Sequence, residues 1–219
     1  MEGALDHGAL MDRLYRWQRR CGFYDATRRY YLLGRDPMIE RLNPPAGGAT
    51  LEIGCGTGRN LVRAARRYPE VEFHGIDISR EMLNAACGAV ARRGLQGRVR
   101  LARADAAAFD PMATFGRASY DRIFISYAVS MIPQWRTVMA NAAGRLAPGG
   151  ELHIADFGDM ADFPAWSRTA ICAWLRWFHV MPRLHLFEAA AEIADAIGGE
   201  SAERRLHGGF SWIAVVKRS

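Results

Sequence analysis

The sequence predicts an α/β protein of three layers, in which a mostly parallel sheet of seven strands lies between helices and ends in an antiparallel hairpin. Three observations support this fold class. Short apolar runs alternate with helix-like segments through the middle of the chain, Asn-Pro-Pro-Ala-Gly-Gly at residues 43–48 separates them from the N-terminal part, and Gly208-Gly209 joins two final strand-like runs. With 219 residues, half of them hydrophobic, the chain is large enough to form one compact core.

The elements follow in a regular order. Strands are expected at residues 50–53, 71–76, 99–101, 120–126 and 151–156. Helices are expected between them at residues 60–67, 79–93 and 131–146. Spacers of this length favour parallel strands covered by helices on both faces. A segment rich in aromatic residues follows at 163–187, then a helix at 188–197 and two strands within 201–216.

The charge of the chain is positive and unevenly placed. There are 29 basic and 23 acidic residues, a net charge of +6, and Lys217 is the single Lys. Residues 13–35 hold seven Arg and one Asp, so this segment by itself carries +6. The composition excludes a disordered chain and a small disulfide scaffold. The four Cys form no C-x-x-C pair, the first twenty residues have no apolar signal region and no uncharged apolar stretch reaches about 18 residues, so we expect a reduced, cytoplasmic protein.

Two parts of the chain are expected. Residues 44–219 form the main domain, with a substrate-binding insertion at about residues 158–187, and residues 1–43 form a helical segment before it. If residues 13–24 are helical, Leu14, Trp17 and Tyr24 share one apolar stripe and arginines occupy the surface around it. Such a helix suits the surface of an anionic bilayer. The alternative is a lid helix that packs on the sheet while its arginines are solvated.

A glycine loop lies where the first strand should end. It reads Leu51-Glu52-Ile53-Gly54-Cys55-Gly56-Thr57-Gly58. The dinucleotide-binding pattern Gly-x-Gly-x-x-Gly needs a glycine three residues after Gly56, where this chain has Arg59. An acid, Glu52, comes two residues before the first glycine. A carboxylate aimed into the site suits a cationic ligand and would repel a pyrophosphate.

This loop resembles motif I of the class I S-adenosylmethionine-dependent methyltransferases, and the resemblance covers residues 48–157. It implies their Rossmann-like fold and S-adenosylmethionine as the cofactor. In that family, glycines at the positions of Gly54, Gly56 and Gly58 let the loop wrap the methionine part of the cofactor. The acid at the position of Glu52 engages the amino group of the cofactor, directly or through water.

The same resemblance implies cofactor contacts at the next two strand tips. Asp77 would accept hydrogen bonds from both ribose hydroxyls, and Ile78 would flank the adenine face. Asp105 would accept from the adenine amino group, and the amide of Ala106 would donate to the ring. The simpler alternative is that Asp77 and Asp105 are merely N-caps of helices that follow the strands.

The string after the fourth expected strand bears on the methyl acceptor. It reads Ser126-Tyr127-Ala128-Val129-Ser130-Met131-Ile132-Pro133, which lacks the Asn/Asp-Pro-Pro-aromatic sequence of base-amino methyltransferases and so disfavours nucleic acid. We place Ser126 among the candidate cofactor-binding residues. No His-x-His, Cys-x-x-Cys or cluster of acids indicates a metal site. The aromatic segment 163–187, with three Trp and three Arg, fits an apolar substrate channel or an interfacial belt, or else ordinary core packing.

Residues 24–36 and 126–135 carry a narrower resemblance, to the bacterial diacylglycerylhomoserine N-methyltransferases of betaine-lipid synthesis. They read Tyr-Asp-Ala-Thr-Arg-Arg-Tyr-Tyr-Leu-Leu-Gly-Arg-Asp and Ser-Tyr-Ala-Val-Ser-Met-Ile-Pro-Gln-Trp. The resemblance implies three methylations of one amine, on a lipid substrate, diacylglycerylhomoserine, at an anionic membrane surface. It also implies a cytoplasmic protein peripherally associated with the inner face of the membrane. The alternatives are phosphatidylethanolamine, a small-molecule acceptor, and a non-catalytic donor-binding protein.

Methyl transfer from a sulfonium needs a neutral amine placed about 3 Å from the methyl carbon. With a single Lys and no well-placed His, Tyr24, Tyr31 and Tyr127 are the candidate catalytic residues. Their hydroxyls can hold the amine and their rings can stabilise a methylammonium by cation–π contact, although each fits a core aromatic equally well. Arg28 or Arg35 could clamp a carboxylate of the donor or of the homoserine headgroup, and we place Arg35 among the candidate cofactor-binding residues.

Overall fold

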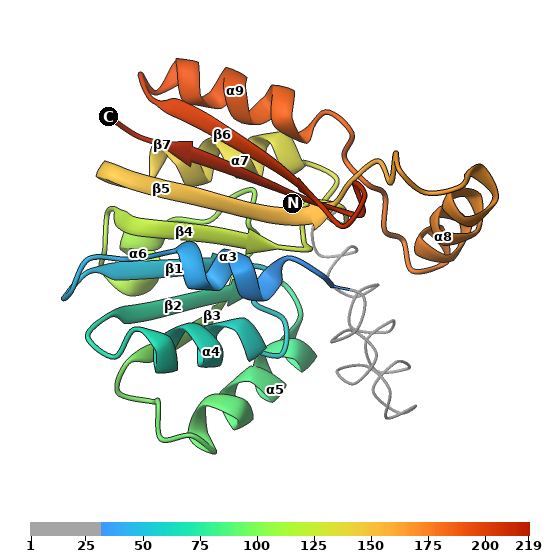
Figure 1. Cartoon of the computed structure of the whole chain (residues 1–219). Coiled ribbons are helices and arrows are strands. Elements are labelled where there is room, and N and C mark those ends of the chain that lie inside the picture. The colour runs from blue at the N-terminus through green and yellow to red at the C-terminus, as the bar shows by residue number, and fades with distance from the viewer. Residues whose placement is uncertain (1–31) are drawn as a thin grey trace.

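The computed structural model describes residues 32–219, which form one seven-stranded sheet between two layers of helices (Figure 1). The strands are β1 (Ala49–Ile53), β2 (Glu72–Asp77), β3 (Val99–Arg103), β4 (Tyr120–Ser126), β5 (Leu146–Phe157), β6 (Glu200–Leu206) and β7 (Ser211–Lys217). They lie in the order β3-β2-β1-β4-β5-β7-β6. Strands β1 to β5 pair in parallel, and β7 pairs antiparallel with both β5 and β6. The predicted three-layer α/β fold and its C-terminal hairpin are confirmed.

The helices divide between the two faces of this sheet. They are α3 (Arg35–Arg41), α4 (Arg59–Arg67), α5 (Arg80–Ala91), α6 (Pro111–Phe115), α7 (Trp135–Gly144), α8 (Ala165–Trp177) and α9 (Leu186–Ala196). Helices α3, α4 and α5 pack on one face, and α6, α7 and α9 pack on the other (Figure 1). Helix α8 stands apart from both layers, beyond the carboxyl ends of the parallel strands.

The central strands are apolar because helices cover both faces of the sheet. All five residues of β1 are buried. Gly75 of β2 faces α4 so closely that an added Cβ would lie 2.4 Å from Cδ1 of Leu61. Glycine therefore lets α4 pack directly on the sheet, and this packing positions the loop between β1 and α4 at the carboxyl edge.

Several boundaries differ from those expected. The helix expected at residues 131–146 begins at Trp135, because the amides of Met131 and Ile132 bond back to the carbonyl of Ala128 at 3.0 and 3.1 Å and close a turn. Strand β5 begins at Leu146, earlier than expected. The aromatic segment 163–187, for which the sequence predicts no element, contains α8.

The N-terminal segment is described only in part. The helix expected at residues 13–24, together with Tyr24, Arg28 and Tyr31, lies outside the described residues. Helix α3 falls inside the expected segment 1–43 and packs against α4 and β5. The division of the chain at residue 43 stays a prediction.

Candidate active site

The glycine loop crosses the carboxyl edge of the sheet between β1 and α4. The amides of Gly54 and Cys55 both donate to the carbonyl of Ile76, each at 2.9 Å, and fix the loop on β2. Gly54 has φ +72°, and a Cβ on it would lie 2.7 Å from Cβ of Ala128, in the turn after β4. The loop after β1 and the turn after β4 therefore touch, and the close approach requires glycine.

Glu52 lies on β1 at the base of this loop and is fully buried. Its Oε1 accepts a hydrogen bond from Nδ2 of Asn60 at 2.8 Å, whereas its Oε2 has no hydrogen-bond partner among residues 32–219. Burial raises the pKa of Glu52 to about 8, against the opposing effects of Asn60 and the Arg35 guanidinium. A buried carboxylate oxygen without a partner is costly, and a cationic group of a ligand would satisfy it.

Asp77, at the tip of β2, binds two backbone amides. Its Oδ2 accepts from the amide of Gly56 at 2.8 Å, and its Oδ1 accepts from the amide of Ser79 at 2.9 Å. Each carboxylate oxygen has a second lone pair, so these bonds are compatible with hydroxyl donors from a ligand. Ile78 is half-buried beside it, at the start of the connection to α5.

Asp105 follows the tip of β3 in the half-buried turn that also contains Ala106. Its Oδ1 accepts from the amide of Ala107 at 2.9 Å, so the side chain caps this turn. Asp105 therefore closes a turn and caps none of the helices described above, since Asp110 is the N-cap of α6. Ser79 is the N-cap of α5, so the helix N-cap alternative is wrong for both Asp105 and Asp77. The contact of Asp105 with an adenine amino group, and that of the Ala106 amide with the ring, stay predictions.

Ser126 and Tyr127 follow each other at the end of β4. The Ser126 hydroxyl is buried and has no hydrogen-bond partner within the described part of the chain. Tyr127 adopts φ +53°, and its ring packs edge-on against Phe157 with the ring centroids 4.7 Å apart. Its hydroxyl donates to the carbonyl of Leu33 and lies 3.0 Å from Oγ of Ser211. Burial raises the pKa of Tyr127, so this hydroxyl stays protonated at neutral pH and ties the start of the described chain to the sheet.

Arg35 is buried at the start of α3, where its Nε donates to the carbonyl of Leu32 at 3.1 Å. Its positive charge acts on Glu52 and Tyr127 and opposes the rise of both pKa values. The structure thus brings Arg35, Glu52 and Tyr127 into one electrostatic neighbourhood.

Sequence reasoning missed a second polar group behind the turn after β4. Asp156 of β5 is fully buried, and its carboxylate accepts from the amides of Ser130 at 3.0 Å and Phe157 at 2.7 Å. Burial raises the pKa of Asp156 to about 6. Arg183 donates to the carbonyl groups of Val129 at 3.1 Å and Ile132 at 2.9 Å. Asp156 lies at the end of an expected strand, and that position was the one sequence signal that could have identified it.

Asn60, the partner of Glu52, was also missed. Its side chain is buried in the first turn of α4, where sequence alone shows an unremarkable polar residue after the glycine loop. Only the folding of α4 back onto β1 brings its amide to the carboxylate. In the described residues, no group of three His, Cys, Asp or Glu side chains could hold a metal ion. No helix within residues 32–219 is long and apolar enough to span a bilayer.

Residues 50–150 match the family model described as a methyltransferase domain. The methyltransferase GfsG of Streptomyces halstedii is 34% identical over 121 residues, which are 55% of this chain and 42% of that protein. The nocamycin O-methyltransferase of Saccharothrix syringae is 33% identical over 140 residues, which are 63% of this chain and 48% of that protein. The chain spans about half the length of these curated relatives.

Solved structures agree with the described fold. An O-methyltransferase family protein from Burkholderia thailandensis superposes with a TM-score of 0.68 at 20% identity, covering 89% of this chain and 59% of that one. Phosphoethanolamine N-methyltransferase 2 of Haemonchus contortus, solved with S-adenosyl-L-methionine, gives a TM-score of 0.61 at 24% identity, covering 78% and 38% of the two chains. The chain therefore has the Rossmann-like fold of the class I S-adenosylmethionine-dependent methyltransferases. Residues 50–150 thus resemble a methyltransferase domain, and S-adenosyl-L-methionine, bound in the Haemonchus contortus neighbour, is the cofactor that the glycine loop predicts.

Proposed function

We propose that this chain is an S-adenosylmethionine-dependent N-methyltransferase that trimethylates the amine of diacylglycerylhomoserine. The observation that carries the donor half of the proposal is the buried Glu52, whose Oε2 has no partner among the described residues. It lies under a loop of three left-handed glycines, where a cationic amino group would complete its hydrogen bonding. The donor half and the acceptor half rest on different residues and are tested separately.

The described residues fit the proposed donor. When bound, S-adenosylmethionine supplies a methyl group on a positively charged sulfur. Glu52 would hold its amino group, and Asp77 would accept from its ribose hydroxyls while keeping the amides of Gly56 and Ser79. Arg35, buried beside them, would hold the donor carboxylate.

The acceptor half of the proposal rests on the turn after β4. This turn lies against the glycine loop at Gly54, so an amine held there would face the donor. Tyr127, with Tyr24 and Tyr31 from the N-terminal segment, would hold the amine by hydrogen bonds and face the growing methylammonium. The homoserine headgroup itself is supported by the sequence resemblance of residues 24–36 and 126–135.

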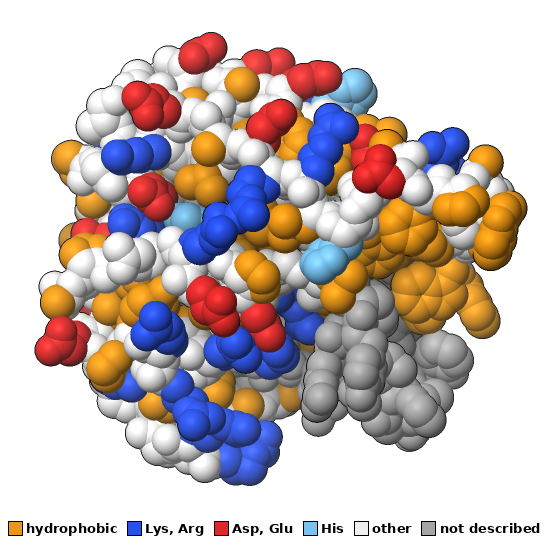
Figure 2. All heavy atoms as spheres, in the orientation of Figure 1, with side chains coloured by type: hydrophobic (Ala, Val, Ile, Leu, Met, Phe, Trp, Pro, Cys, Tyr) orange, Lys and Arg blue, Asp and Glu red, His pale blue; other side chains and the backbone are white. Residues whose placement is uncertain are grey.

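The charge of one molecular face supports an anionic membrane as the source of the lipid. A cleft of about 870 Å³ crosses α4 between α3 and α5. Its charged lining consists of Glu40 and five arginines, namely Arg59, Arg63, Arg66, Arg67 and Arg93. Figure 2 shows basic side chains gathered on this face. Positive charges near an anionic surface each favour binding by roughly 1 kcal/mol.

A single assay tests the proposal. The protein is incubated with methyl-labelled donor and a panel of acceptors, and the lipids are separated by thin-layer chromatography. We expect label in mono-, di- and trimethylated diacylglycerylhomoserine. Label in phosphatidylethanolamine alone would show that the acceptor is the alternative headgroup and not the homoserine lipid. Label in a soluble hydroxyl acceptor alone would overturn the proposal that the substrate is a lipid. Donor binding without any transfer would overturn the proposal that the chain is an enzyme.

Tyr127 is tested with a matched partner variant. Tyr127→Phe should slow methyl transfer about tenfold, the cost of one hydrogen bond to the reacting group, with donor affinity little changed. The control is Ser211→Ala, because Oγ of Ser211 donates to the same Leu33 carbonyl at 2.9 Å and leaves the phenol in place. Turnover and donor affinity are measured for both variants. Equal slowing by both would show that Tyr127 only tethers Leu33.

A further inference from the structure

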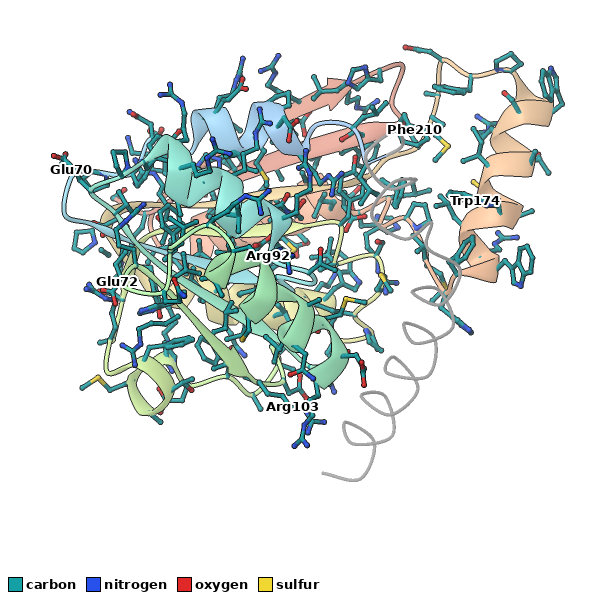
Figure 3. The ribbon with its side chains drawn as sticks, turned by 90° about the horizontal axis from the view of Figure 1, so that it is seen from below. Glu70, Glu72, Arg92, Arg103, Trp174 and Phe210 are labelled. Atoms are coloured by element: carbon teal, nitrogen blue, oxygen red, sulfur yellow. The ribbon has the colours of Figure 1, made fainter. Side chains whose placement is uncertain are left out.

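Helix α8 carries the most exposed large aromatic side chains of the described chain. Trp166 is 78% exposed and Trp177 is 73% exposed, at the two ends of a helix that runs from Ala165 to Trp177. Leu175 is the one residue of this helix that is buried. Figure 3 shows α8, which carries Trp174, set apart from the body of the molecule. Core packing, one of the alternatives for the aromatic segment, therefore does not account for these two tryptophans.

The exposed tryptophans share one face of the helix. Trp166, Ala170, Ala173 and Trp177 follow each other at intervals of four, three and four residues, the spacing of a single helical stripe. Leu175 lies on the other side of the helix, where it packs into the core cluster. The stripe therefore points away from the protein, with two exposed indole rings separated by two small residues.

Helix α8 itself carries charges of one sign only. It contains two Arg and no Asp or Glu, whereas the exposed Asp162 comes before the helix begins. Arg168 and Arg176 are exposed on α8 itself, outside the tryptophan stripe. Indole rings prefer the headgroup level of a bilayer, where the apolar ring is buried and the N–H finds a polar partner. Arginines beside them complement anionic headgroups.

The segment that follows α8 is connected to the turn after β4 by one backbone hydrogen bond and by the side chain of Arg183. Beyond α8, the amide of Met181 donates to the carbonyl of Ser130 at 3.0 Å. Two residues later, Arg183 binds the carbonyl groups of Val129 and Ile132. A ligand or surface bound to α8 would thus lie next to the turn that holds the acceptor in the proposed function.

We propose that the Trp166–Trp177 face of α8 inserts into the headgroup region of an anionic lipid bilayer and seats the turn after β4 at the membrane surface. This inference rests on the proposed function, because it assigns the surface through which a lipid acceptor reaches the site. It commits to a bilayer as the occupant because exposed indoles and exposed arginines lie together on a helix that carries no acidic residue.

The test compares two variants of the full chain. Trp166→Ala combined with Trp177→Ala removes both indoles, and Met112→Ala, 57% exposed on α6 at the other end of the molecule from α8 (Figure 1), is the control. Binding is measured by sedimentation with vesicles of equal parts phosphatidylcholine and phosphatidylglycerol, without donor or homoserine lipid. We expect the double variant to bind about tenfold or more weakly and the control to bind like the original chain. Because both indoles are exposed, thermal unfolding and donor binding should be unchanged in each.

A second readout locates the indoles. Vesicles with brominated acyl chains should quench the tryptophan fluorescence of the original chain, and the double variant should lose most of this quenching. Unchanged vesicle binding by the double variant would overturn the proposal. So would a concentration-dependent dimer, seen by analytical ultracentrifugation, that the double variant abolishes, because a second copy would then cover α8.

The outcomes also separate this inference from the proposed function. If α8 proves necessary for vesicle binding while no acceptor lipid is labelled, the proposed function fails and the docking surface stands. If diacylglycerylhomoserine is labelled and the double variant binds vesicles normally, the docking surface fails and the proposed function stands.

Discussion

Asp77 holds two backbone amides in this structure, and the proposed function gives the same carboxylate a second role. It fixes the glycine loop through Gly56 and the turn before α5 through Ser79. In the proposed function it also receives the donor ribose. A substitution there therefore changes stability as well as donor binding, and the two effects must be measured separately.

We predict that Asp77→Ala lowers donor affinity at least about tenfold and lowers the free energy of unfolding by about 1–3 kcal/mol, because two amides lose their acceptor. Asp77→Asn is the matched variant, since its one carbonyl oxygen retains one of the two amides while the carboxylate charge is lost. Calorimetry with the donor and urea unfolding measure the two effects. Donor affinity unchanged in Asp77→Ala would remove Asp77 from the donor site.

At the scale of elements, the site depends on contact between two connections that are far apart in sequence. The loop between β1 and α4 touches the turn between β4 and α7 at Gly54 and Ala128. Arg183 donates to the carbonyl of Val129, and the Asp156 carboxylate accepts from the amide of Ser130, so both side chains hold that turn in place. A side chain at Gly54 would therefore push on the turn after β4, which holds the acceptor in the proposed function, as well as on the glycine loop.

We predict that Gly54→Ala destabilises the chain more than Gly94→Ala does. Both glycines have a positive φ, +72° and +65°, so both variants carry similar backbone strain. A Cβ at Gly94 would meet nothing within 4 Å, whereas at Gly54 it would meet Ala128 at 2.7 Å. Urea unfolding should show an excess loss of about 1–3 kcal/mol in Gly54→Ala, the usual range for overpacking. Equal losses of unfolding free energy in the two variants would mean that the glycine loop and the turn after β4 can move apart without an energetic cost.

At the scale of the whole molecule, three buried groups make stability depend on pH. Burial raises the pKa of Glu52 to about 8 and that of Asp156 to about 6, and it lowers the pKa of His74 from its usual 6.5. The folded chain keeps a proton on Glu52 between pH 4.5 and 8 that the unfolded chain has released. Stability from Glu52 is thus full at low pH and is lost as the pH rises through 8. Asp156 also lowers the free energy of unfolding as the pH rises, but only up to about pH 6. His74 raises the free energy of unfolding as the pH rises, but only below pH 6.5.

Between pH 6.5 and 8, Glu52 should dominate. We predict that the free energy of unfolding of the donor-free chain falls by about 1–2 kcal/mol over this interval, from the limit of 1.36 kcal/mol per pH unit for one proton. Glu52→Gln keeps the size of the side chain and should flatten the dependence. Denaturant unfolding at several pH values provides the measurement. A wild-type curve as flat as that of the variant would show that Glu52 is ionised throughout.

Much of the fold was predictable because it depends on local patterns. The apolar runs identified β1 to β5, and Gly208-Gly209 identified the hairpin of β6 and β7. The turn at residues 128–132 was not predicted, because its helix-like composition gives no sign of the backbone bonds that close it on Ala128. Helix α8 was not predicted either, because its exposed tryptophans do not give the usual pattern of a helix with one buried face.

By itself, the sequence determined the order of elements, the glycine loop and the acids at the strand tips, because strand periodicity and motif spacing are properties of neighbouring residues. Only the tertiary structure decided which side chains meet. It brought Asn60 to Glu52, Ser211 to Tyr127 and Arg183 to the turn after β4, and it left Trp166 and Trp177 facing outward. The physical reason is that hydrogen bonds and burial between distant segments depend on the packing of whole elements, which no local pattern records.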